Sequence, residues 1–332
     1  MFACDLGAAL SARGRVVQTV AVSRGFSPGG LPVEPLGTGA LNAARRLRAL
    51  RKPGEILVAH GSTAVPTCAL AAIGKRGFVY RNIGDPGYWA ASPARRLRLA
   101  AYLHSAQRVV VLWPGAAEVL VRLHHVAASR IRPIPNGVPA ERFPAVHPSE
   151  RSAARSALGL PAAVPIVAYV GALSPEKDPA AAVRAVARHP ELVLAVSGNG
   201  PQRAAVEQLA ANVAPGRVHF LGVTDTPQTV LAAADALVIP SRTEGMPAVA
   251  IEAAFTGIPV VATDVGALRE VVVDGETGRI VARDSDGALD EALRDVLADG
   301  VRMGERGRAH CLARFEIGIV GAAWDELLDE VR

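Results

Sequence analysis

Two carboxylates flank a predicted helix start between Pro240 and Ala254, where a short apolar run leads into a loop. Pro247 suits the first turn of a helix, where its missing N–H costs nothing. The unpaired N–H groups from Gly245 to Val249 would then favour an anion such as a diphosphate. Glu244 precedes the helix and Glu252 follows eight residues later, so one carboxylate could address a reacting group and the other the hydroxyls of the same ligand. The alternative is that both are surface charges.

Two further loops in this half follow predicted strands. Gly171 to Lys177 forms the first loop and Ser197 to Pro201 the second, and glycines in both permit close backbone approach to a ligand. Lys177 is the only lysine after residue 150 in an arginine-rich chain, which suits a compact ammonium beside a diphosphate. A chance surface lysine is the alternative. Gly198 and Gly200 lack the third glycine of a dinucleotide fingerprint, which disfavours a nicotinamide dehydrogenase.

Short valine- and isoleucine-rich runs alternate with alanine-rich segments along the chain, which is typical of βα units in a parallel sheet. The predicted strands are Val16–Val22, Ile56–Ala59, Phe78–Arg81, Val109–Leu112 and Ile131–Pro135, then Ile166–Val170, Leu192–Val196, Val218–Phe220, Ala236–Ile239, Pro259–Ala262 and Gly278–Val281. A linker at 139–149 divides them into two doubly wound α/β domains. Residues 5–13 already have a helical pattern, so we expect the first domain to lack its opening central strand.

Composition sets the class of protein. The chain has 332 residues, of which 50% are hydrophobic and 20% charged, and this length favours two domains. Its three cysteines are too few and scattered for a disulfide framework or zinc cluster, and no metal site is evident. The start lacks the features of a signal peptide, and no apolar stretch approaches the roughly 20 residues of a spanning helix. We therefore expect a cytoplasmic protein that is soluble or peripheral.

Charge is distributed unequally. Residues 1–160 contain 21 Lys and Arg against 7 Asp and Glu, a balance of +14, whereas the remainder contains 15 against 24, a balance of −9. Basic runs at 45–52 and 95–98 could contact an anionic membrane or an acidic substrate, and the alternative is a solvated helix face. Nucleic acid is disfavoured because aromatic residues are not interleaved with these runs.

The order of motifs resembles that of the retaining glycosyltransferases of family 4, which have the GT-B fold of two Rossmann-like domains facing a cleft. The matching elements are Gly171 with Glu176-Lys177, Gly198-Asn-Gly-Pro201, Val218-His-Phe-Leu-Gly222, Val238-Ile-Pro-Ser241, Glu244-Gly-Met-Pro247 with Glu252, Gly257 to Ala262, Gly266 with Glu270, Asp274-Gly275 with Gly278, and upstream Ile134 to Val138 with Arg142-Phe143.

The resemblance implies that the second domain binds a nucleotide-diphosphate sugar. Glu244 would contact the donor sugar, Glu252 the ribose hydroxyls, and Lys177 the diphosphate. The other implied donor-binding residues are Gly171, Gly198, Asn199, Gly245, Met246, Pro247, Ala248 and Val249. The family needs no metal or other cofactor, since the cation and the helix end stabilise the leaving group. Transfer would retain the anomeric configuration.

Three departures from the family pattern concern activity. Ala172 stands where the family usually has a second cation, an arginine, for the diphosphate. Asn82 stands near the position of a histidine close to the acceptor, whereas His60 matches an earlier family histidine at a strand end. The third departure is the absent opening strand.

We therefore predict an acceptor-side domain at 1–145, a donor-binding domain at 146–312 and a C-terminal helix at 313–332, with Glu244, Lys177, His60 and Asn82 as candidate catalytic residues. The predicted function is transfer of a sugar to an acceptor, with an anionic or lipid-linked glycan precursor of the cell envelope preferred. Peripheral contact with the inner membrane face is expected on the same grounds. The alternative is a catalytically impaired GT-B protein that binds a nucleotide or a partner.

Overall fold

The computed structural model describes residues 2–22, 35–37, 39–74, 77–89, 92–285 and 287–332. The chain divides into two compact units, unit 1 (Met1–Gly137 with Ile317–Arg332) and unit 2 (Val138–Glu316). The division follows Gly137, whereas the sequence predicted it after residue 145. Most of the predicted C-terminal segment, from Ile317 onward, belongs to unit 1.

Unit 1 contains a parallel sheet whose four described strands lie in the order β1-β2-β3-β4. The strands are β1 (Leu57–His60), β2 (Phe78–Arg81), β3 (Arg108–Val111) and β4 (Ile131–Pro133). The helices are α1 (Phe2–Ala12), α2 (Ala40–Leu50), α3 (Val65–Ala72), α4 (Pro86–Trp89), α5 (Pro93–Ser105), α6 (Pro114–His124), the short 3-10 helix Ala128–Arg130, and α15 (Ile317–Glu330).

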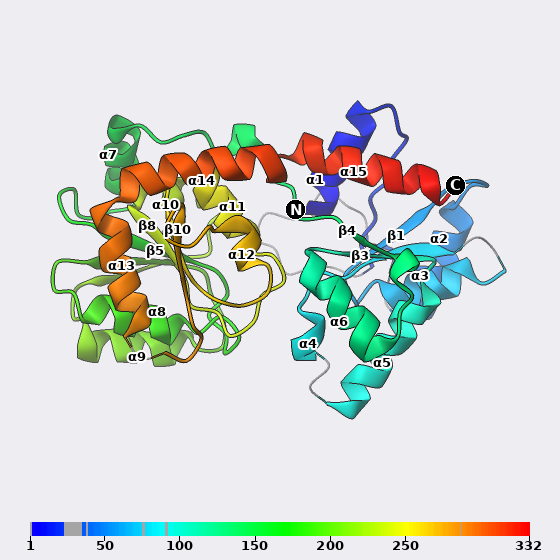
Figure 1. The fold of residues 1–332 in the computed structure, drawn as a ribbon, viewed down its shortest axis with the longest axis horizontal. Coiled ribbons are helices and arrows are strands. Elements are labelled where there is room, and N and C mark those ends of the chain that lie inside the picture. The colour runs from blue at the N-terminus through cyan, green and yellow to red at the C-terminus, as the bar shows by residue number, and fades with distance from the viewer. Residues whose placement is uncertain (1, 23–34, 38, 75–76, 90–91, 286) are drawn as a thin grey trace. The chain divides into compact units, whose positions relative to one another are not determined.

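Alternate side chains of these strands enter two cores, because successive residues of a strand point to opposite faces. Val79 and Val110 lie in one core with α1 and α15, where Trp324 is fully buried. Phe78 and Tyr80 lie in the other core with α2, α3, α5 and α6. Figure 1 shows α15, in red, beside α1, in blue, and the two helices are in contact.

The predicted strand Val16–Val22 is wrong. Val16 is fully exposed, and the described part of this segment forms only an isolated bridge, between Ala21 and Pro35. A strand needs a hydrogen-bonded neighbour as well as β-branched residues, and the described residues give this segment no neighbouring ladder. The helical pattern of residues 5–13 is confirmed as part of α1.

Unit 2 contains a six-stranded parallel sheet in the order β10-β9-β8-β5-β6-β7. The strands are β5 (Ile166–Val170), β6 (Val193–Ser197), β7 (Val218–Gly222), β8 (Ala236–Ile239), β9 (Val260–Thr263) and β10 (Gly278–Val281). The helices are the 3-10 helix Ala140–Arg142, α7 (Pro148–Ala157), α8 (Pro179–Ala187), α9 (Arg203–Val213), α10 (Pro227–Ala233), α11 (Ala248–Phe255), α12 (Leu268–Val271), α13 (Ala288–Ala298) and α14 (Gly300–Phe315).

The direction of strand addition reverses between β5 and β8. From β5 the chain adds β6 and β7 on one side, and it then returns to place β8 directly against the other side of β5. In open α/β sheets a ligand crevice lies beyond the carboxyl ends of the strands at such a switch point. The loops that follow β5 and β8 therefore border the position where such a crevice would lie.

No helix in the described ranges has both the length and the apolarity to cross a bilayer.

Candidate functional site

Lys177 and Glu244 meet at the switch point of unit 2. Lys177 lies in the loop after β5, and Glu244 lies in the loop after the adjacent strand β8. The ammonium Nζ of Lys177 lies 2.6 Å from each carboxylate oxygen of Glu244. Two residues that are 67 positions apart in the sequence thus form one charged pair.

This pair has one buried and one accessible member. The Glu244 side chain is 6% exposed, and it also accepts a 2.7 Å hydrogen bond from the Ser241 hydroxyl. The Lys177 side chain is 33% exposed. Such an ammonium can neutralise a phosphate, and the fixed carboxylate can accept hydrogen bonds from hydroxyl groups. Ser241 belongs to one of the family motifs, but the sequence alone indicated no role for it.

Helix α11 begins one residue later than predicted. Pro247 is its N-cap residue with extended backbone angles, and Ala248 is the first helical residue. A proline has no N–H to donate, so the helical amides begin at Ala248 and Val249. Met246 is buried, and Glu252 lies on α11 with a partly buried side chain. The predicted donor residues from 244 to 252 thus form one continuous loop and helix.

The glycines at 198 and 200 lie where the loop after β6 packs closely against the loop after β5. A Cβ atom at Gly198 would lie 1.8 Å from the carbonyl oxygen of Gly171, and one at Gly200 would lie 2.4 Å from that of Leu173. Backbone hydrogen bonds join the same loops, including Leu173 N–H to the carbonyl of Asn199 at 3.0 Å. The two glycine loops therefore support each other. The Asn199 side chain accepts a bond from the Gly200 N–H.

Gly266 has a similar role beside Glu244. Its φ is +58°, and a Cβ atom there would lie 2.3 Å from the Glu244 carbonyl oxygen. The next residue, Ala267, donates its N–H to the Gly245 carbonyl at 2.8 Å. The loop after β9 thus supports the backbone that carries the site carboxylate. Ala172 is exposed, and its carbonyl accepts a hydrogen bond from the Tyr169 hydroxyl.

His60 and Asn82 lie at neighbouring strand ends in unit 1. His60 ends β1 and pairs in register with Arg81, which ends β2 and immediately precedes Asn82. The His60 ring lies 6.1 Å from the rings of both Phe2 and Trp324. Unit 1 therefore brings both predicted acceptor-side residues to the carboxyl edge of its sheet.

Arg81 is a buried cation that sequence reasoning missed. The residue is 3% exposed, its guanidinium lies 3.8 Å from the centre of the Phe2 ring, and it donates to the Asn136 side chain. Within the described ranges no carboxylate forms an ion pair with it. Buried arginines are rare, so only a strand-end position next to His60 and Asn82 could have drawn attention to it.

Burial controls the protonation of this cluster. Desolvation, assisted by the positive charge of Arg81, lowers the pKa of His60 from 6.5 to about 3. Desolvation also lowers the pKa of Arg81 to about 9, so the guanidinium is still charged at neutral pH. At neutral pH His60 is thus an uncharged hydrogen-bonding group beside a cation.

His60 should make unit 1 sensitive to mild acid. The folded state keeps the imidazole neutral down to about pH 3, whereas the unfolded chain takes up the proton near pH 6.5. Below pH 6.5 the unfolded state binds more protons than the folded state. The free energy of unfolding therefore decreases by about 1.4 kcal/mol for each unit by which the pH is lowered. We expect His60→Leu to remove about 2 kcal/mol of this loss between pH 6.5 and 5.

Tryptophan fluorescence can follow the unfolding of unit 1 separately, because all three tryptophans, at 89, 113 and 324, belong to this unit. Denaturant titrations of the native and His60→Leu proteins at each pH would measure the difference. Parallel pH dependence in the two proteins would show that His60 is protonated in the folded state.

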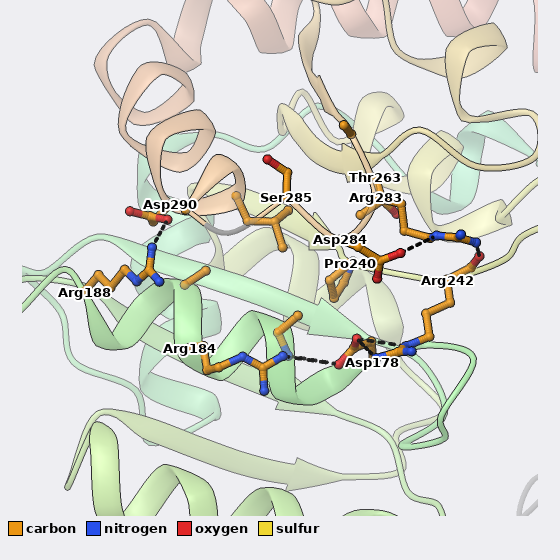
Figure 2. A pocket seen from close by; sticks show the side chains of 15 residues that line it. Asp178, Arg184, Arg188, Pro240, Arg242, Thr263, Arg283, Asp284, Ser285 and Asp290 are labelled. Carbon is orange, nitrogen blue, oxygen red and sulfur yellow. Dashed lines mark hydrogen bonds and ion pairs between the residues drawn. The ribbon is translucent and has the colours of Figure 1, made fainter.

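A separate pocket of about 250 Å³ lies beside the Lys177 and Glu244 loops (Figure 2). It is bounded by α8, the start of the loop after β8, and residues from the ranges 282–285 and 287–290. Four arginines and three aspartates line it: Arg184, Arg188, Arg242, Arg283, Asp178, Asp284 and Asp290. None of the predicted donor-binding residues lines this pocket.

Comparison with known proteins gives matches over both units. Residues 150–310 match the family described as glycosyl transferases group 1, and residues 2–142 match glycosyltransferase family 4. The D-inositol 3-phosphate glycosyltransferase of Nocardia farcinica is 36% identical over 269 residues, which are 76% of this chain and 56% of that protein. The corresponding protein of Mycobacterium avium is 36% identical over 57% of this chain and 46% of its own length. The chain therefore spans about half of the length of these curated relatives.

Solved structures show the same fold. Sucrose-phosphate synthase from Thermosynechococcus elongatus has a TM-score of 0.84 and 26% identity, covering 99% of this chain and 92% of its own. Anabaena Alr3699/HepE, solved in complex with UDP-glucose, has a TM-score of 0.86 and 21% identity, covering 99% and 95%. With both family matches and this GT-B architecture, the chain belongs to the family 4 glycosyltransferases.

Proposed function

We propose that the protein transfers a sugar from a nucleotide-diphosphate donor to an acceptor, with retention of the anomeric configuration. The observation that carries this proposal is the Lys177–Glu244 pair at the strand switch point, with α11 starting four residues after Glu244. A relative named D-inositol 3-phosphate glycosyltransferase and a structural neighbour holding UDP-glucose support the same class of reaction.

Each group has a defined task in this reaction. The Lys177 ammonium and the first amides of α11 would stabilise negative charge on the departing diphosphate. Glu244 would accept hydrogen bonds from the donor sugar, and Glu252, further along α11, would hold the ribose hydroxyls. The leaving phosphate would help to take the acceptor proton. With Ala172 in place of a second cation, Lys177 would supply the neutralising side chain of this loop without a metal.

The acceptor is proposed to be an anionic glycan precursor bound by unit 1. Arg81 supplies a buried positive charge next to His60 and Asn82, and the relatives' name includes a phosphorylated compound, D-inositol 3-phosphate. At neutral pH the uncharged His60 could accept a hydrogen bond from an acceptor hydroxyl.

Titration and turnover together test the proposed function. Isothermal titration with UDP, GDP and ADP should identify one base that binds, and hydrolysis of its sugar conjugate in EDTA should proceed undiminished. Failure of all three nucleotides to bind would refute the proposal. Binding without turnover, for any donor and acceptor tried, would instead favour the alternative of a nucleotide-binding GT-B protein, which the lost cation at Ala172 motivates.

We further propose that α2 and α5 contact an anionic membrane on the cytoplasmic side. Neither helix contains an acidic residue, and Arg45, Arg48 and Arg98 are exposed. Leu97 is 74% exposed on α5, and Leu41 is 56% exposed on α2. Arginines attract anionic lipid and exposed leucines can enter its interface, so the combination favours peripheral binding.

Vesicle sedimentation tests the membrane proposal. Because each arginine near an anionic surface contributes about fivefold in affinity, Arg45→Gln with Arg48→Gln should weaken binding to phosphatidylglycerol vesicles by more than tenfold. Arg294→Gln with Arg306→Gln removes two exposed arginines from unit 2 and should leave binding unchanged. Equal sedimentation with anionic and neutral phosphatidylcholine vesicles would contradict the proposal.

A further inference from the structure

Asp178, the residue after Lys177, has an unusual backbone. Its φ is +41° and its ψ is +57°, which is the left-handed region that residues with a side chain seldom occupy. It is the N-cap of α8, and one oxygen, Oδ1, accepts the Ala181 N–H at 3.2 Å. Capping uses Oδ1 of the carboxylate, so Oδ2 can accept a hydrogen bond from another residue.

That second oxygen binds Arg242. Both Nε and Nη2 of Arg242 lie 3.1 Å from Oδ2 of Asp178, as the dashed lines in Figure 2 show. The Asp178 side chain is 15% exposed and the Arg242 side chain 54%. Arg242 lies two residues before Glu244, so this ion pair joins the loop of the ammonium to the loop of the carboxylate.

Backbone contacts reinforce the same junction. The Arg242 N–H donates to the Glu176 carbonyl at 2.8 Å, one residue before Lys177. On the other side, Nη1 of Arg283 donates to the Arg242 carbonyl at 3.3 Å. The two loops are therefore fixed to each other immediately next to both charged residues of the site.

We propose that Asp178 and Arg242 are positioning residues that set the distance between Lys177 and Glu244. The Lys177 ammonium reaches both Glu244 oxygens at 2.6 Å, a geometry that small loop shifts would disturb. Catalytic groups lose rate steeply when they are displaced by about 1 Å. This inference rests on the proposed function for its kinetic consequence, while its structural consequence can be measured without it.

Three substitutions separate positioning from helix capping. Asp178→Asn retains the cap and tolerates positive φ, but it removes the charge that holds Arg242. Arg242→Gln removes the other partner. Arg184→Gln is the matched control, because Arg184 is also 54% exposed and lies 3.8 Å from Asp178, yet it sits on α8 and does not join the loops.

Hydrogen exchange gives a readout that needs no substrate. Peptides covering 172–178 and 238–246 should exchange at least tenfold faster in Asp178→Asn and in Arg242→Gln, because the bond from the Arg242 amide to Glu176 opens more often. Arg184→Gln should match the native protein. Unchanged exchange in both test variants, or faster exchange in the control, would overturn the proposal.

Kinetics with whichever donor the native protein turns over supply the second readout. We expect kcat to fall about tenfold in either variant, with the donor KM within about threefold, because misplacement weakens transition-state contacts more than ground-state binding. The double variant should be no slower than the single ones, since one junction is lost in each case. The positioning role would be overturned if the kcat losses of the two single variants multiplied in the double variant, or if kcat were unchanged in the single variants. A native protein without turnover refutes the proposed function, and the exchange data still decide the positioning role.

Discussion

Lys177→Met is expected to reduce donor turnover by about 100- to 1,000-fold, the loss found when one preorganised charge-stabilising donor is removed from an active site. The native Lys177 side chain is 33% exposed at the switch point of unit 2, where it can meet a diphosphate while its ammonium stays within 2.6 Å of Glu244. Affinity for the matching nucleoside diphosphate should fall about tenfold by titration calorimetry. Turnover within threefold of the native value would contradict the role given to Lys177.

A double substitution separates chemistry from stability in this experiment. Lys177→Met alone deprives the buried Glu244 carboxylate of its cation while the hydrogen bond from the Ser241 hydroxyl stays, and this should cost stability. Solvent screening of the partly exposed lysine limits the cost to about 1–2 kcal/mol. Adding Glu244→Gln removes the unpaired charge and should restore most of this stability. Turnover should remain low in the double variant, and its recovery would mean that the single variant failed through misfolding.

Buried strands were the part of the fold that local sequence predicted best. Phe78–Arg81, Ile166–Val170, Ala236–Ile239 and Gly278–Val281 are strands with the predicted bounds. Parallel strands are covered by helices on both faces, so they are continuous apolar runs bounded by turn residues. Val16–Val22 has the same composition, but its strand would depend on a neighbour that composition cannot reveal.

The sequence predicted the residues of the site one by one, but only the strand order of the sheet brings them together. Lys177 and Glu244 each stood out because they follow predicted strands, yet nothing local places β5 against β8. The strand order makes them a pair, and it also creates the junction between Asp178 and Arg242. These two were missed because a surface-type ion pair between distant loops leaves no periodic pattern in the sequence.

In unit 1 one residue, Arg81, was missed by the sequence analysis because its type is expected at the surface. Arg81 was counted with the basic charge of its half, and a charged side chain is expected at the surface. Its strand end is covered by Phe2 and by the neighbouring Asn136, so that the arginine is buried and polarises the surroundings of His60. A charge total over a domain therefore conceals a buried cation that lies beside the candidate acceptor residues.

The loops at 171–177 and 197–201 of unit 2 are in close contact, so adding a single methyl group at Gly198 should destabilise the unit strongly. Gly198→Ala would place its Cβ 1.8 Å from the Gly171 carbonyl oxygen, at a φ of +143° that side chains rarely adopt. The displaced atom belongs to the backbone of the Lys177 loop and cannot rotate away. Strain of this kind should destabilise unit 2 by about 3 kcal/mol or more.

The same substitution should displace the loop that carries Lys177 and weaken nucleoside diphosphate binding by at least tenfold. Gly216→Ala is the matched control, because Gly216 also has a positive φ, +74°, but a Cβ added there would have no neighbouring atom within 4 Å. It should lose only about 1 kcal/mol and retain native binding. Denaturant unfolding followed by circular dichroism, together with calorimetric titration, measures both quantities. Equal losses in the two variants would mean that left-handed backbone strain, and not contact between the loops, determines the cost.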